Sequence, residues 1–122
     1  MAGSVSVRIS STYSSIPEGS RVVGPLTLTS ADANYQVQTT ELASGTNTIT
    51  VPTSPATSGC IIILPSTNTQ VTTLKGVGGD TGIAIGKTTT TVINWDSTAA
   101  PASFVLSSAA AQTGKITEII FF

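Results

Sequence analysis

The chain has 122 residues, of which 9% are charged, with five Lys or Arg against six Asp or Glu. This length suits one domain around a single core and excludes a multidomain enzyme. So few positive charges cannot build the basic surface that a phosphate backbone requires, so no nucleic-acid partner is expected. Thr and Ser occupy 22 and 16 positions, a composition that favours strands and turns.

The sequence contains no His and a single Cys, Cys60. The most common general base and the most common metal ligands are therefore missing, and the acidic residues lack the spacing of a calcium loop. We expect no enzyme activity, no cofactor and no metal, and we predict that Cys60 is a small buried apolar residue. No apolar stretch is long enough for a membrane span, and the first residues lack a signal-peptide pattern, so a soluble protein made in a cytoplasm is expected.

The first 20 residues are rich in Ser and end in a Pro-Glu-Gly turn signal. We predict that residues 1–20 form an extended arm and that residues 21–122 form one sandwich domain. Within the arm, Val5, Val7 and Ile9 alternate with polar residues, which is typical of an edge strand. This strand can pair within its own chain or with a neighbouring subunit, and in the second case these three residues are candidate interface contacts.

From residue 21 onward, turn signals recur about every ten residues between β-branched segments. This pattern predicts an all-β fold, an antiparallel, jelly-roll-like β-sandwich of about eight strands. The stretch 107–112 is Ala-rich and helix-like, but we expect a connection there. The expected strands cover residues 22–29, 34–42, 46–51, 60–64, 70–77, 83–85, 89–95, 102–108 and 115–122.

Two of these strands, 60–64 and 115–122, contain segments that are apolar on both faces. Such strands must be covered on both sides, by a second layer or by another subunit, and we predict that they lie near the middle of the sandwich. Phe121 and Phe122 are the favoured contacts with another subunit if the core cannot cover both rings. The low charge and a mean hydropathy of +0.31 also favour a homo-oligomer, with a trimer preferred.

Two short motifs suggest catalytic or nucleotide chemistry, but each is better explained as a turn. Asp80-Thr81-Gly82 is the triplet of dimeric aspartic proteases, yet it follows two glycines of a tight turn and not an apolar strand. Gly86-Lys87-Thr88 resembles the end of a phosphate-binding loop, but a strand-forming run follows where that loop needs a helix.

A third motif, Asn94-Trp95-Asp96, places an aromatic ring between two polar groups, which is the minimum needed to stack a sugar and bond its hydroxyls. These three residues are weak sugar-contact candidates, because a lone Trp at a strand end more often closes the end of a sandwich core. A carbohydrate-binding module that uses Trp95, Tyr35 or Tyr13 is therefore the second class of function considered.

Residues 40–122 contain the segments CIIILPSTNT at 60–69, TLKGVGGDTGIAI at 73–85, SFVL at 103–106 and EIIFF at 118–122. These segments resemble small β-sandwich virion proteins of tailed bacteriophages. The resemblance implies a structural virion protein without catalytic residues, made in the bacterial host cytoplasm. It implies a capsid cement or decoration protein that binds the major capsid protein and stabilises the head shell; the alternative is a tail, fibre or baseplate component with a role in binding host carbohydrate.

Overall fold

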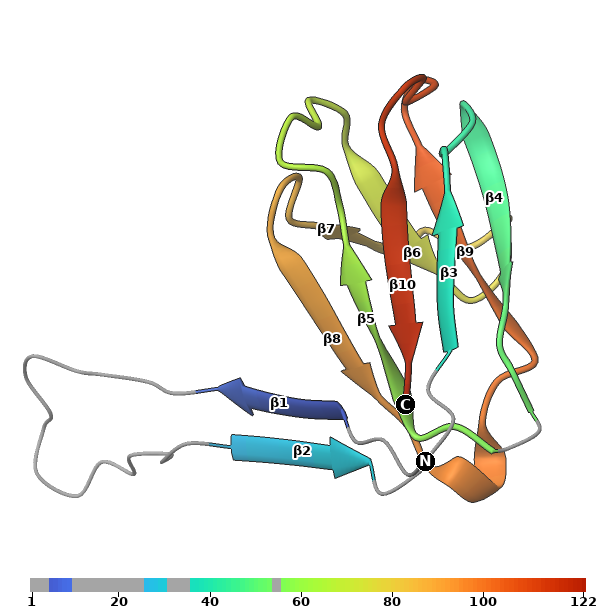
Figure 1. Cartoon of the computed structure of the whole chain (residues 1–122). Coiled ribbons are helices and arrows are strands. Elements are labelled where there is room, and N and C mark those ends of the chain that lie inside the picture. The colour runs from blue at the N-terminus through green and yellow to red at the C-terminus, as the bar shows by residue number, and fades with distance from the viewer. Residues whose placement is uncertain (1–4, 10–25, 31–35, 54–55) are drawn as a thin grey trace, which may run out of the picture.

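The computed structural model describes residues 5–9, 26–30, 36–53 and 56–122. Eight strands form two four-stranded antiparallel sheets that pack face to face (Figure 1). The front sheet has the order β3-β10-β5-β8, with bounds Gln36–Thr40, Thr117–Phe121, Gly59–Ile63 and Thr90–Asn94. The back sheet has the order β4-β9-β6-β7, with bounds Gly45–Thr50, Ser103–Ser108, Thr72–Lys75 and Ile83–Ile85.

The order of these strands defines a jelly roll. When β3 to β10 are counted as strands one to eight, the front sheet reads 1-8-3-6 and the back sheet reads 2-7-4-5. Consecutive strands therefore cross between the sheets at almost every connection, which is the double Greek-key arrangement of this fold. The prediction of an all-β, jelly-roll-like antiparallel sandwich is confirmed.

The two remaining strands, β1 (Val5–Ile9) and β2 (Leu26–Ser30), pair with each other in an antiparallel ribbon and belong to neither sheet. The N-terminal strand thus pairs within its own chain in this structure. The described part of the strand expected over residues 22–29 lies in β2, which pairs with β1 and not with the sandwich. The expected domain boundary near residue 20 lies outside the described residues and stays a prediction.

The apolar strands β5 and β10 occupy the two central positions of the front sheet, as expected. The back sheet covers only their inner face, where Ile62, Ile119 and Phe121 are fully buried. Phe122 is also buried, so the core covers both terminal rings. Phe121 and Phe122 were expected to contact another subunit only if the core left one of them uncovered, and it does not. The buried core cluster consists of Leu42, Ile49, Val51, Cys60, Ile62, Leu64, Phe104, Leu106, Ile119 and Phe121.

The outer face of the front sheet keeps an apolar row that runs across all four strands. The register places Ile120 opposite both Val37 and Ile61, and Ile61 opposite Val92. Val37 is 49% exposed, and the other three residues are partly buried. The expected second cover for the doubly apolar strands is therefore not supplied by the described part of this chain.

Residues 109–112 of the helix-like stretch form a connection, as expected, while Ser107 and Ser108 end β9, and hydrogen bonds explain why the connection is not helical. The Ala109 N–H donates to the Val71 carbonyl, and the Gln112 N–H donates to the Leu42 carbonyl, so these donors serve neighbouring segments and not a helix. The buried Gln112 side chain then donates through Nε2 to Ser108 Oγ at 3.0 Å. These bonds hold the β9–β10 connection against the end of the core.

Candidate functional site

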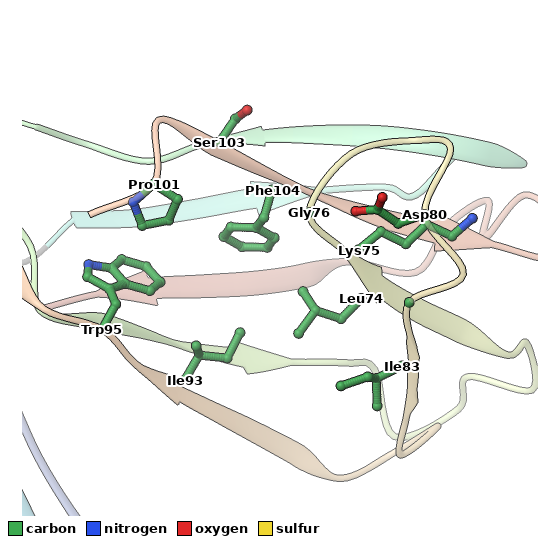
Figure 2. Close-up of a pocket in the computed structure, with 11 residues that line it drawn as sticks. Leu74, Lys75, Gly76, Asp80, Ile83, Ile93, Trp95, Pro101, Ser103 and Phe104 are labelled. Atoms are coloured by element: carbon green, nitrogen blue, oxygen red, sulfur yellow. The ribbon is translucent and has the colours of Figure 1, made fainter. Parts of the chain in front are cut away.

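The described chain contains a groove of about 400 Å³ between the free edges of the two sheets, where β7 and β8 lie opposite each other. Figure 2 shows the groove with Ile93 and Trp95 on one side and Leu74 and Ile83 on the other. Phe104 lies at its floor. The walls are therefore mainly aliphatic and aromatic, and the groove is suited to cover apolar groups.

Trp95 follows directly after β8 and closes one end of the core. Its indole Nε1 donates to the Thr57 carbonyl at 2.8 Å, and its ring centroid lies 6.4 Å from that of Phe121 in a tilted arrangement. This geometry matches the structural interpretation of the lone Trp as a core plug. Because the indole N–H is already bonded inside the chain, only the partly exposed ring surface remains to contact a ligand in the groove.

The two polar neighbours of Trp95 lie outside the lining of the groove. Asp96 caps the short 3-10 helix Ser97–Ala99, and its Oδ1 accepts hydrogen bonds from the Thr98 N–H at 2.8 Å and the Thr98 hydroxyl at 2.7 Å. These bonds lower the pKa of the Asp96 carboxyl below its usual value. Asn94 is exposed at the end of β8 and lines no part of the groove. The sugar-contact role of these residues stays a prediction.

Asp80 lies at the opposite end of the groove, in the turn between β6 and β7. Its Oδ2 accepts a hydrogen bond from the Val77 N–H at 2.9 Å, and its own N–H donates to the Val77 carbonyl at 3.1 Å. The side chain therefore closes a local turn, as the glycines before it suggested. Lys75 also lines this end and donates through Nζ to the Gly78 carbonyl at 3.4 Å.

The Gly86-Lys87-Thr88 segment is an exposed turn, and the strand β8 follows it, as predicted. The buried Asn68 side chain holds this turn in place, because its Nδ2 donates to the Lys87 carbonyl at 2.7 Å. No helix begins in this part of the described chain, so the helix N-terminus that a phosphate-binding loop uses is not found here.

Cys60 lies at the centre of the core, where burial raises the pKa of its thiol to about 12. It is thus a small buried apolar residue, as predicted, and its thiol stays protonated near neutral pH. Within the described residues, no group of three or more His, Cys, Asp or Glu side chains lies close enough to hold a metal ion. The same part of the chain contains no helix that is long and apolar enough to cross a membrane.

Val5, Val7 and Ile9 all belong to β1, and the structure places their backbone opposite β2. Their side chains lie outside the described part of the molecule, so their interface role stays a prediction. Sequence reasoning missed the groove itself, because no local sequence pattern marks it. Ile83 belongs to a three-residue strand that follows a glycine turn, and it is 70% exposed.

Comparisons of this chain with protein-family models, with curated proteins and with solved structures gave no match.

Proposed function

We propose that this chain is a structural virion protein of a tailed bacteriophage, a capsid cement protein that binds the major capsid protein and stabilises the head shell. The observation that carries the proposal is the complete eight-strand jelly roll with strand orders 1-8-3-6 and 2-7-4-5. Viral capsid proteins, lectins and cupins share this architecture. The metal-binding cupin chemistry that uses His ligands is unavailable to a chain without His.

The surface composition supports a packing role over a catalytic one. The back sheet presents a mainly polar outer face, because Thr46, Thr48 and Thr50 of β4 and Ser107 of β9 alternate with inward residues, and the register adds Val105 and Lys75 to this face. The front sheet presents the apolar row that contains Ile61 and Ile120. One mainly hydroxyl face and one face with an apolar row suit a rigid unit that contacts other proteins on more than one side.

We further propose a homotrimer located on the shell, with no nucleic-acid or membrane contact. The low charge and the uncovered apolar row support association with copies of the same chain or with the major capsid protein. Cyclic symmetry allows a small domain to contribute several weak contacts to a shell at once.

The test is to delete the gene and image the particles by electron microscopy. We expect heads that lack regularly placed surface density and that lose their genome at a lower temperature than wild-type heads. Adding the purified protein back should restore both the density and the thermal stability. Density lost from the tail, fibre or baseplate with unchanged heads would contradict the cement proposal and favour the tail alternative.

A further inference from the structure

Strand β8 has a free backbone edge. It pairs with β5 on one side, and no described strand lies on its other side. The Trp95 N–H donates to the Ser58 carbonyl at 2.8 Å, which fixes the alternation of the antiparallel ladder. Every second residue from Trp95 therefore bonds to β5, and the N–H and C=O groups of Thr90, Val92 and Asn94 point toward the free edge.

The apolar groove lies directly beside this edge. A strand added to β8 would continue the front sheet, and its alternate residues would face the back sheet across the groove. Ile83, Ile93 and Trp95 form the wall that such residues would meet. Ile83 would change from largely exposed to covered, so the added strand supplies both ladder hydrogen bonds and apolar contact.

The ribbon of β1 and β2 has the complementary pattern. Its register places Val7 opposite Leu28 and Ile9 opposite Leu26, and directly opposite residues of an antiparallel pair share a face. By backbone register, the aliphatic positions 5, 7, 9, 26 and 28 therefore belong to one face of the ribbon, together with Ser30 opposite Val5, while Ser6, Arg8, Thr27 and Thr29 belong to the other. A two-stranded ribbon alone is marginally stable, and this one pairs with neither sheet.

We propose that β1 of a second copy of this chain pairs antiparallel with β8, with Val7 opposite Ile93, so that the apolar face of the ribbon covers the groove. Both strands are five residues long. Arg8 is the one charged residue of β1. The charged residues that line the groove, Lys75 and Asp80, lie at the end away from Trp95. Arg8 is then on the solvent face of the extended sheet.

This contact deepens the homo-oligomer proposed above by naming its two surfaces, and it does not require attachment to a particle. Each copy donates one ribbon and receives one ribbon, so the contact is heterologous, and the proposal is that it closes into a ring and not into an open filament. The ring leaves neither a free β8 edge nor an open groove on any copy. A trimer is the ring expected from the proposed function.

The first experiment measures the mass of the full-length protein by sedimentation velocity from about 1 to 200 µM. We expect wild-type protein to associate, and Ile83→Asp to weaken association at least tenfold, because it puts a carboxylate where the aliphatic face would dock. The matched control is Ile116→Asp, which makes the same change at a residue that is 50% exposed and lines no part of the groove. It should associate like wild type. Circular dichroism and thermal melting confirm that both variants fold.

A backbone variant covers the case in which Ile83→Asp does not fold. Val92→Pro removes an N–H that points to the free edge, so it costs no bond to β5, and proline is tolerated at such edge positions. It should fold and fail to associate. Association that persists unchanged in either folded variant would overturn the proposed contact while leaving a homo-oligomer in place. A wild-type protein that stays monomeric to 200 µM would overturn both the contact and the homo-oligomer in solution. The electron-microscopy test of the shell is independent of both results.

Cross-linking tests the register and the identity of the partner. Ser6→Cys on one chain and Asn94→Cys on another, differently tagged chain lie opposite each other in the proposed register, and the buried Cys60 does not compete. We expect a disulfide between the two chains under mild oxidation. Replacing Asn94→Cys by Thr48→Cys, an exposed position on the outer face of the back sheet, should abolish it. Equal yields from the two mixtures would overturn the proposal.

Discussion

At the scale of single residues, Cys60 shows how burial controls chemistry. Its thiol is fully buried between the sheets, and burial raises its pKa from 9.0 to about 12. The unfolded chain therefore loses the thiol proton near pH 9.0, while the folded chain keeps it to about pH 12. Because the folded state binds the extra proton in this range, Cys60 makes the free energy of unfolding fall as the pH rises from 9 to 12.

The prediction is a difference between two pH profiles. Wild-type protein should lose more stability between pH 9 and 12 than Cys60→Ala, whose profile lacks this titration, when the free energy of unfolding is measured by urea denaturation at each pH. The thiol should also resist a thiol reagent at pH 8 in native buffer and react at once in denaturant. Parallel profiles for the two proteins would show that Cys60 is not protected by the core.

Gly59 at the start of β5 is a second residue with a packing requirement. A Cβ at this position would overlap the Ile93 carbonyl oxygen and would lie 2.8 Å from Cζ of Phe122. Gly59→Ala should therefore destabilise the fold by about 2 kcal/mol. Gly79→Ala is the matched control, because a Cβ there meets no atom within 4 Å, and it should change stability by less than about 0.5 kcal/mol. Equal melting temperatures of the two variants would contradict this account.

At the scale of elements, most strands follow from the sequence because β-branched residues alternate with polar residues between turn signals. The strand 83–85 was predicted at its observed bounds, and most other sandwich strands are a residue or two shorter at one or both ends. The pairing of β2 with β1 was not predictable, because an alternating strand fits any free edge and its partner depends on the path of the chain. Phe121 and Phe122 were ambiguous for a related reason, since an apolar run does not say which face the core covers.

In the doubly apolar strand β5, substitutions can show which face the core covers. Ile62 is fully buried between the sheets, while its neighbour Ile61 faces outward and is only partly buried. Ile62→Thr should destabilise the protein by about 3 kcal/mol, because it loses apolar contact and buries a hydroxyl, while Ile61→Thr should cost about 1 kcal/mol. Chemical denaturation of both variants gives the comparison. A larger cost for Ile61→Thr would place a second cover on the outer face of the front sheet.

At the scale of the whole molecule, the jelly-roll class was predictable from composition and turn spacing, while the groove was not. The groove exists because the edges of the two sheets separate between β7 and β8, and the separation of two sheets depends on how all their inner residues pack. Trp95 was recognised as a core plug from its place at a strand end. Its second contribution, a wall of the groove, depends on Ile83 across the gap and has no local pattern.

The separate pairing of β1 and β2 leads to a prediction about truncation. Every strand of the sandwich has its partners within residues 36–122, and the ribbon pairs with neither sheet. A chain that lacks residues 1–35 should therefore fold and melt within about 4 °C of the full-length protein, since a change of 1 kcal/mol corresponds to roughly 4–8 °C for a domain of this size. Thermal unfolding followed by circular dichroism at about 1 µM measures this without a contribution from association. The same truncated chain should stay monomeric at 200 µM, because it has no ribbon to donate. A melting temperature lower by 10 °C or more would show that the first 35 residues belong to the core, because the sandwich would then depend on contacts beyond its own strand pairing.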